Sequence, residues 1–185
     1  MKLQGVLAAQ AEEALAAVAK ELEIRHGGGT PFFEALDERM RDDYWYRALL
    51  LRYLDTYGEQ HEPIDVTEIG GPPRFITGDR PYIAVSGKFG QGFAGWLAGS
   101  EWGRYVPPVA VFPGDLRHNV LPKLDQDLTG RQYVFMDDSY YKGRTYGQIS
   151  RRIVEAGGGV LGAIILYDGS PEPAKVPSFF RYHRP

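Results

Sequence analysis

The chain has 185 residues, of which 43% are hydrophobic and 24% charged, a balance typical of a folded globular domain rather than a disordered segment. Its 21 Lys and Arg residues are interleaved with 24 Asp and Glu residues, so the net charge of -3 argues against non-specific nucleic-acid binding. No cysteine is present, which excludes disulfides, thiolate nucleophiles and cysteine-based metal sites.

The N-terminal stretch and the histidines narrow the class of protein further. Apolar residues near the N-terminus are interrupted by Gln10, Glu12 and Glu13, and no segment approaches the roughly 20 apolar residues of a membrane span. The four histidines show no spacing typical of metal ligands. We therefore expect a cytoplasmic protein with no membrane association, no nucleic-acid partner and no structural metal. The sequence leaves open whether the chain forms a homodimer.

Two helices are predicted within residues 1–57. Hydrophobic residues recur at helical spacing over residues 3–24, and a run of glycines then ends that pattern. Thr30 followed by Pro31 is typical of an N-cap and a first helical position, and a second long helix is expected to reach about Tyr57. Its inward face is predicted from residues three or four positions apart: Phe33, Leu36, Met40 and Tyr44.

The middle of the chain has short β-prone runs separated by Gly and Pro, at residues 66–69, 74–77, 82–86 and 109–112. A glycine-containing turn at residues 86–90 and a short helix at residues 90–99 would complete a strand–helix–strand unit. Residues 114–130 lack periodicity and are predicted to form a long exposed loop. Loops of this length tend to be functional or mobile.

The last third of the chain has the clearest pattern. Residues 133–136 form a buried-strand run that ends in two acids, residues 139–144 form a turn, and residues 145–156 have helical character. Three glycines end that helix. Residues 161–166 are almost continuously apolar, as expected for a parallel strand that is covered on both faces.

Asp137 and Asp138 are the first candidate site residues, because open α/β sheets bind ligands at the carboxyl ends of their strands. Two adjacent carboxylates suit a vicinal diol such as that of ribose, and a divalent cation can bind in the same region. In the following turn, Gly143 lets the backbone approach an anion, and the next helix offers its N-terminus to a phosphate. Further donors and positive charge come from Ser139, Lys142, Arg144 and Thr145.

A helix cap is the simpler reading of two acids and a glycine turn, but the whole string Tyr133-Val-Phe-Met-Asp-Asp-Ser-Tyr-Tyr-Lys-Gly-Arg-Thr145 resembles the phosphoribosyl pyrophosphate motif of type I phosphoribosyltransferases. The resemblance implies an α/β fold with a Rossmann-like parallel sheet flanked by helices, N-terminal helices and a small variable hood. By the same resemblance, Asp137 and Asp138 would hold the ribose hydroxyls and Mg²⁺, while residues 142–145 would wrap the 5-phosphate.

A second stretch, Ser86-Gly87-Lys88-Phe89-Gly90, is similar in position and composition to the family's pyrophosphate loop. The resemblance gives Lys88 a catalytic role toward the pyrophosphate and gives Ser86 and Gly87 a binding role. Many glycine-containing turns look like this one. We expect one phosphoribosyltransferase-like domain over residues 1–185, with a helical part at residues 1–57 and a core at residues 80–170.

The resemblance also gives a role to the long loop predicted at residues 114–130. By this resemblance the loop would close over the ligand, with Arg117, His118 and Lys123 as charge-stabilising candidates. An ordinary solvated loop is the alternative.

Two features depart from the family pattern. Tyr141 and Lys142 stand where many members have small hydroxyl residues, and purine-salvage members commonly have Asp at the position of Tyr141, which puts a hypoxanthine or guanine acceptor in doubt. The tail, residues 175–183, resembles a base-stacking segment faintly and an edge strand better. The leading hypothesis is a Mg²⁺-dependent transferase acting on an unidentified nitrogen acceptor; a regulatory nucleotide-binding protein and a phosphoribosyl hydrolase are the alternatives.

Overall fold

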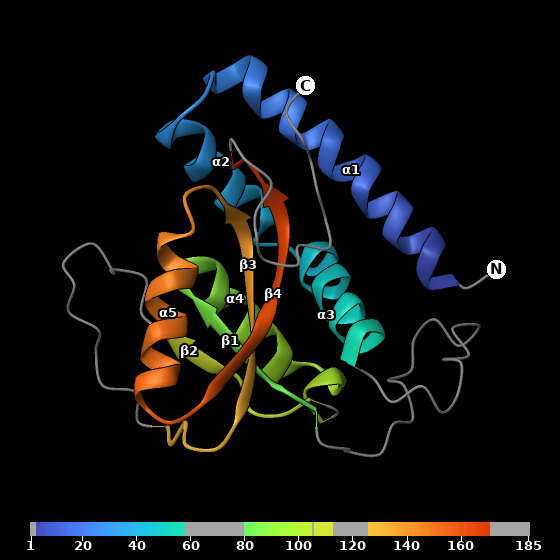
Figure 1. Ribbon diagram of the computed structural model, residues 1–185. Helices are drawn as coiled ribbons and strands as arrows, with labels where there is room; N and C mark the ends of the chain where they lie inside the picture. Colours follow the sequence, from blue (N-terminus) through green and yellow to red (C-terminus); the bar gives the residue numbers. More distant parts are fainter. Residues whose placement is uncertain (1–2, 58–79, 105, 113–125, 171–185) are drawn as a thin grey trace.

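A parallel sheet with the strand order β2-β1-β3-β4 forms the centre of the protein (Figure 1). The computed structural model describes residues 3–57, 80–104, 106–112 and 126–170. Within this part the strands are β1 (Tyr82–Ser86), β2 (Ala110–Phe112), β3 (Gln132–Tyr140) and β4 (Gly159–Asp168). The predicted parallel α/β sheet flanked by helices is therefore confirmed.

Side chains alternate along each strand, and both faces of the sheet carry apolar side chains that helices cover. One face packs against α4 (Gly87–Gly99) and against the N-terminal helices, and the other packs against α5 (Arg144–Glu155). The first face carries Ile83, Val85, Val134, Met136, Ile164 and Leu166. The second face carries Ala84, Phe112, Tyr133, Phe135, Ala163 and Ile165, which pack with Ile149 and Ile153 of α5. A sheet buried on both sides explains the continuous apolar runs of the sequence.

The two helical crossovers leave the middle of the sheet in opposite directions. The chain passes from β1 through α4 and the short 3-10 helix η1 (Glu101–Arg104) to β2 on one side. It passes from β3 through α5 to β4 on the other side. The strand order therefore reverses between β1 and β3, and open α/β sheets form their ligand crevice beyond the carboxyl ends of the strands at such a point.

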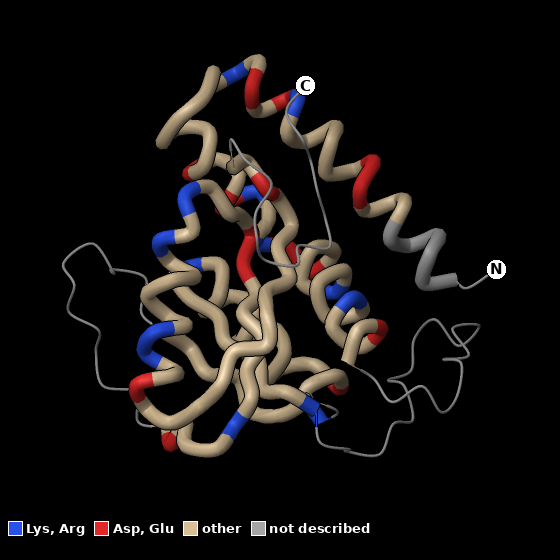
Figure 2. The backbone as a smooth tube through the Cα atoms, in the orientation of Figure 1, with Lys and Arg blue, Asp and Glu red and all other residues tan. Residues whose placement is uncertain are grey.

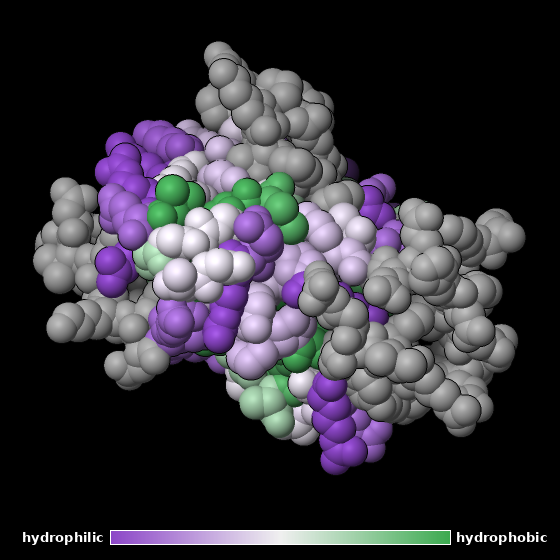
Figure 3. Space-filling model, turned by 60° about the horizontal axis from the view of Figure 1, so that its bottom comes forward, coloured by the Kyte–Doolittle hydropathy of each residue, from purple (hydrophilic) through white to green (hydrophobic). Residues whose placement is uncertain are grey.

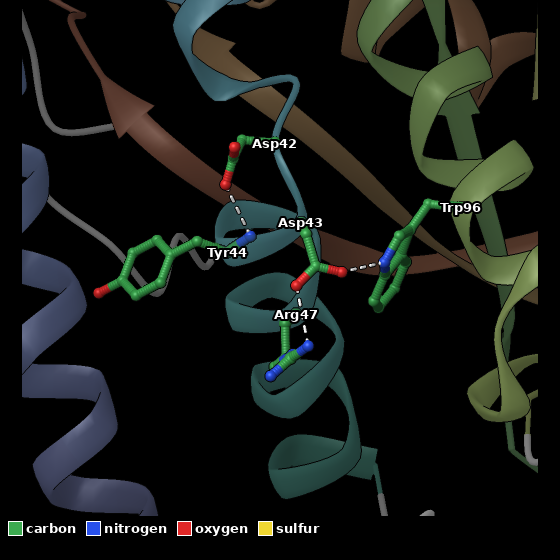
Figure 4. A network of polar contacts seen from close by, with 5 residues as sticks. All are labelled: Asp42, Asp43, Tyr44, Arg47 and Trp96. Carbon is green, nitrogen blue, oxygen red and sulfur yellow. Dashed lines mark hydrogen bonds and ion pairs between the residues drawn. The ribbon is translucent and has the colours of Figure 1, made fainter. Parts of the chain in front are cut away.

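The predicted second helix is in fact two helices, α2 (Thr30–Met40) and α3 (Asp43–Tyr57), so this expectation was wrong. Figure 4 shows the polar contacts after the break: the Asp42 carboxylate accepts a 2.9 Å hydrogen bond from the backbone N–H of Tyr44. Asp43 accepts hydrogen bonds from Arg47, at 2.8 Å, and from the indole N–H of Trp96 in α4. A side chain that satisfies the free N–H groups of a new helix competes with continuation of the old one.

The start of α2 also differs from the prediction. Thr30 is the first helical residue, and the N-cap is Gly29 with φ 80°, a left-handed conformation that suits glycine. Phe32 is buried in the core, whereas Phe33 is only half-buried. The predicted inward face is therefore wrong by one residue at this end of the helix. Tyr44, which was predicted on the same face, lies in α3 and has an exposed fraction of 45%.

The long helix α1 (Leu3–His26) lies outside α2 and α3 as an outer layer (Figure 1). Among residues 9–26 of this helix, the buried ones are Ala11, Leu15, Ala19 and Leu22. Helix α3 is joined to the sheet by the buried Tyr53 hydroxyl, which donates a 2.5 Å hydrogen bond to the Pro81 carbonyl next to β1. Among the helices that the structure describes, not one has the length and apolar character needed to cross a membrane.

Several predicted segments have different bounds in the structure. Strand β3 continues through the two acids to Tyr140, so the turn that follows is shorter than predicted. The predicted strands at residues 66–69 and 74–77 and the tail at residues 175–183 lie outside the described residues, as does most of the loop predicted at residues 114–130. The single-domain boundaries stay a prediction.

Large hydrophobic side chains that remain exposed are scattered over the described part: Ile24, Tyr44, Tyr141, Val154 and Leu161. On the face that Figure 3 turns forward, groups of hydrophobic residues (green) are separated by more hydrophilic residues (white to purple). Scattered exposure of this kind is ordinary for globular proteins, so it identifies no partner surface.

Candidate functional site

A hollow of about 400 Å³ opens beyond the carboxyl ends of β1 and β3, at the point where the strand order reverses. It is lined from the β1–α4 junction, from the end of β3 with the following turn and from α2. All ten predicted site residues line it: Ser86, Gly87, Lys88, Asp137, Asp138, Ser139, Lys142, Gly143, Arg144 and Thr145. The structure thus brings together two stretches that are about 50 residues apart in the sequence.

Asp137 and Asp138 are both nearly buried, with exposed fractions of 9% and 6%. The backbone N–H of Asp138 donates a 3.0 Å hydrogen bond to Oδ1 of Asp137. Because strand side chains alternate, Asp138 follows Met136 toward the layer of α2 and α4, whereas Asp137 follows Phe135 toward α5. The two carboxylates therefore reach the hollow from different faces of the sheet.

Burial makes both carboxylates reluctant to ionise. It raises the pKa of Asp137 well above its usual range, and the neighbouring charge of Asp138 adds to the rise. Burial raises the pKa of Asp138 to about 6. The charge of Asp37 also raises this pKa, whereas a hydrogen bond with Asp137 lowers it. A ligand with hydroxyl donors or a cation would stabilise two acids buried in this way.

The turn between β3 and α5 is built around Gly143, the N-cap of α5, at φ 65°. A side chain here would be strained by that φ, and its Cβ would lie 2.8 Å from Cζ of Tyr140 and still nearer to its hydroxyl. The first N–H groups of α5 have no partner within the helix and carry its positive dipole end. This terminus is therefore suited to a phosphate group.

Basic side chains surround the same turn. Lys142 and Arg144 are exposed and line the hollow, and neither forms an ion pair within the part of the chain that the structure describes. Figure 2 shows basic positions (blue) near the start of α5 at the same end of the sheet as an acidic segment (red) of β3. The hollow thus combines an anion-binding corner, formed by Lys142, Gly143 and Arg144, with an acidic corner, formed by Asp137 and Asp138 with Asp37 nearby.

The second predicted phosphate-binding stretch has a different backbone from the one expected. Residues 87–90 are the first turn of α4 rather than a separate loop, so this expectation was wrong. Gly87 begins the helix at φ 67°, directly after the buried Ser86. At Gly90 a Cβ would lie 2.8 Å from Cβ of Val85, so glycine here reflects close packing of α4 on β1. Lys88 is nevertheless exposed and lines the hollow at a helix N-terminus.

Sequence reasoning missed the contribution of α2. Phe33 and Asp37 both line the hollow, and burial raises the pKa of Asp37 while the nearby charges of Arg41 and Lys88 lower it. The i, i+4 spacing of Phe33 and Asp37 was visible in the sequence, but Phe33 was assigned to the core face. Arg117, His118 and Lys123 lie outside the described residues.

The residues at the acidic corner fit Mg²⁺ by the chemistry of their donors. Asp137 and Asp138 offer carboxylate oxygens, and Mg²⁺ commonly takes one or two carboxylates and completes its shell with water and substrate phosphates. Within the described residues there is no group of three or more His, Cys, Asp or Glu side chains that could hold a metal ion by itself. A magnesium site here would therefore need ligand oxygens as well as Asp137 and Asp138.

No protein-family model matches the chain, and no curated protein matches it in sequence. Solved structures with a similar fold include a phosphoribosyltransferase from Corynebacterium diphtheriae, at 13% identity over 85% of this chain and 82% of that chain, with a TM-score of 0.49. A purine phosphoribosyltransferase from Pyrococcus horikoshii Ot3 is 16% identical over 75% of this chain and 84% of that chain, with a TM-score of 0.48. An HGPRT-ase from Leishmania tarentolae in complex with GMP is 15% identical over 75% and 76% of the two chains, with a TM-score of 0.47.

Proposed function

We propose that the chain binds phosphoribosyl pyrophosphate and transfers its phosphoribosyl group to a nitrogen acceptor with release of pyrophosphate. One observation carries the proposal: the buried acid pair of β3, the Gly143 turn and the β1–α4 junction face a single hollow at the reversal point of the sheet. A ligand that fits must present hydroxyl donors and phosphate groups at the same time. Ribose 5-phosphate with a second phosphate group at C1 does so.

The acid pair suits the 2- and 3-hydroxyls of the ribose. Asp137 and Asp138 are held by β3 and are nearly removed from water, so a hydroxyl donor bonded to each would form a charge-assisted hydrogen bond of about 1.5 to 3 kcal/mol. Burial raises the pKa of both carboxyls, and donation from a ligand opposes that effect. The acids are therefore expected to contribute more to ligand binding than to folding.

The two helix N-termini suit the two phosphate groups. The turn at Gly143, with Lys142, Arg144 and Thr145, is proposed to hold the 5-phosphate, and Ser139 adds a hydroxyl donor. Ser86, Gly87 and Lys88 at the start of α4 are proposed to hold the pyrophosphate. Asp137 and Asp138 would also hold Mg²⁺, which when bound neutralises charge on the pyrophosphate.

In the proposed reaction the bond between C1 of the ribose and the pyrophosphate oxygen breaks, and its electron pair leaves with the pyrophosphate. A nitrogen lone pair of the acceptor forms the new bond to C1, and the nitrogen then releases a proton. Lys88 faces the growing negative charge of the leaving group, so its interaction strengthens toward the transition state. Lys142 contacts a phosphate whose charge does not change, so its contribution is to binding.

Calorimetry tests the binding half of the proposal. Ribose 5-phosphate and phosphoribosyl pyrophosphate, each with Mg²⁺, should bind the wild-type chain, and the double change Asp137→Asn and Asp138→Asn should weaken binding at least tenfold. Asp127→Asn, which removes an exposed acid that does not line the hollow, should leave affinity unchanged. Unchanged affinity in the double variant would remove the main argument. Pyrophosphate release over nucleobases and simple amines then tests transfer.

A regulatory protein that binds the same compound without turnover is the second candidate. Tyr141 and Lys142 motivate it, because they place bulk and charge in the phosphate turn, with Nζ of Lys142 5.6 Å from the centre of the Tyr141 ring. Binding without pyrophosphate release for any acceptor, water included, would favour this candidate. Release to water alone would favour a phosphoribosyl hydrolase instead.

A further inference from the structure

One face of α2 extends into the hollow from outside the sheet. Phe33 and Asp37 are four residues apart, so they lie on the same side of the helix, and both line the hollow. The neighbouring Phe32 and Leu36 are buried in the core, with exposed fractions of 3% and 0%, and they hold α2 in place. Phe33 and Asp37 are therefore positioned by packing and not by their own contacts alone.

Aromatic rings form part of this wall. The ring of Phe33 lies 5.2 Å from that of Tyr141, at 44° between the planes, and 6.1 Å from that of Tyr167, at 66°. Tyr141 belongs to the turn after β3 and keeps an exposed fraction of 46%. Aromatic side chains on two separate elements give a surface on which a planar ring can pack face-on or edge-on.

Asp37 adds an acceptor beside these rings. Its Oδ2 lies 3.5 Å from Nε of Arg41, while its Oδ1 accepts no hydrogen bond from a residue that the structure describes. The carboxylate is close enough to Lys88 and to Asp138 for each charge to influence another's ionisation. Its negative charge disfavours a phosphate at this place and favours an N–H or amino donor.

We propose that Phe33 and Asp37 of α2, with Tyr141, form the acceptor subsite of the hollow, which takes a planar ring that carries an N–H or amino group. This inference rests on the proposed function for the identity of the other ligand, the phosphoribosyl compound. It assigns selection of the acceptor to a helix that precedes the sheet in the sequence. Phe33 would pack against the ring, and Asp37 would accept its hydrogen bond.

Ligand-observed NMR provides the test, with adenine, guanine, hypoxanthine, cytosine and uracil as ring probes. Benzoate, a ring with negative charge and without N–H, and butylamine, an amine without a ring, serve as comparison compounds. At least one base should bind the wild-type chain, and neither comparison compound should. Asp37→Asn and Phe33→Leu should each weaken that base about tenfold, because one removes the charge of the acceptor and the other the ring.

The controls separate this subsite from the rest of the hollow. Glu34→Gln removes the same charge from an exposed position of α2 and should change no affinity. Both subsite variants should bind ribose 5-phosphate within twofold of wild type. If no base binds although ribose 5-phosphate does, or if neither variant changes base affinity, the subsite is refuted. If a base binds in an Asp37-dependent way and ribose 5-phosphate does not bind, the subsite stands and the proposed function fails. Should Phe33→Leu not fold by circular dichroism, Asp37→Asn decides.

Discussion

Replacing Asp138 by Asn should stabilise the ligand-free protein and weaken its ligand binding. Asp138 is 6% exposed, and burial raises the pKa of its carboxyl from 3.8 to about 6. One pKa unit corresponds to about 1.4 kcal/mol, so the ionised carboxylate lowers the free energy of unfolding by about 3 kcal/mol at pH above 6. Asparagine keeps the size of the side chain without this charge.

The sign of the pH dependence follows from the direction of the shift. Because the pKa is higher in the folded state, the folded protein holds the Asp138 proton between about pH 4 and pH 6 when the unfolded chain has lost it. The free energy of unfolding of the wild-type protein should therefore fall as the pH rises through this window. The gain from Asp138→Asn should be absent near pH 4 and reach about 1 to 3 kcal/mol at pH 7.5.

Urea unfolding at pH 4 and at pH 7.5, without ligand, measures both values. Asp127→Asn is a control of opposite sign, because hydrogen bonds from Thr129 lower the pKa of the Asp127 carboxyl. That change should not stabilise the protein at pH 7.5. A loss of stability in Asp138→Asn at pH 7.5, or a gain of equal size at both pH values, would refute the reasoning, since the second result would point to packing instead of charge.

Three further predictions concern the Gly143 turn, the two lysines and the pH dependence of ligand binding. Gly143→Ala should lower the free energy of unfolding, measured in urea, by about 1 to 3 kcal/mol, and it should weaken the binding of ribose 5-phosphate. Gly27 has a similar φ of 68° but open space around it, so Gly27→Ala should show only the smaller effect of backbone strain. In steady-state kinetics with phosphoribosyl pyrophosphate, Lys142→Ala should raise KM more than it lowers kcat, and Lys88→Ala should lower kcat; affinity losses alone for both would favour the regulatory candidate. In calorimetry the affinity for ribose 5-phosphate should fall as the pH drops through 6, because Asp138 takes up a proton. In Asp138→Asn the affinity should depend on pH less steeply, since only the ionisation of the ligand phosphate remains. An equally steep profile in the variant would contradict it.

The segment from β3 to β4 was predictable from the sequence because its local signals agree. The apolar strand, the glycine at the turn and the helical pattern of α5 each specify the same structure, and Gly143 has the left-handed φ that the turn requires. The position of Asp137 and Asp138 relative to the strand end was less accurate. Strand β3 pairs with β4 up to Tyr140, beyond the end of its pairing with β1 at Met136, and a single sequence does not show where a partner strand stops.

The contribution of α2 could not be predicted because it depends on helix rotation. Phe32 and Phe33 are adjacent, and either could face the core by periodicity; packing against the sheet buries Phe32 and leaves Phe33 at the hollow. The break between α2 and α3 depends on contacts that are distant in the sequence, since Trp96 of α4 donates to Asp43. At residues 87–90 the glycines indicated a loop, but Gly90 instead allows α4 to pack closely on Val85.

The acidic corner connects folding to binding. Burial raises the pKa of Asp37, Asp137 and Asp138, so ionisation of these three carboxyls lowers the stability of the fold. A ligand that donates hydrogen bonds to these carboxylates, together with a divalent cation, should restore that stability. A ligand at 100 times its Kd stabilises a folded protein by about 2.7 kcal/mol, which is close to the effect attributed to Asp138 alone. At that ligand concentration the wild type should therefore unfold at a higher urea concentration than the ligand-free wild type, and the same concentration of ligand should raise the midpoint of Asp138→Asn less.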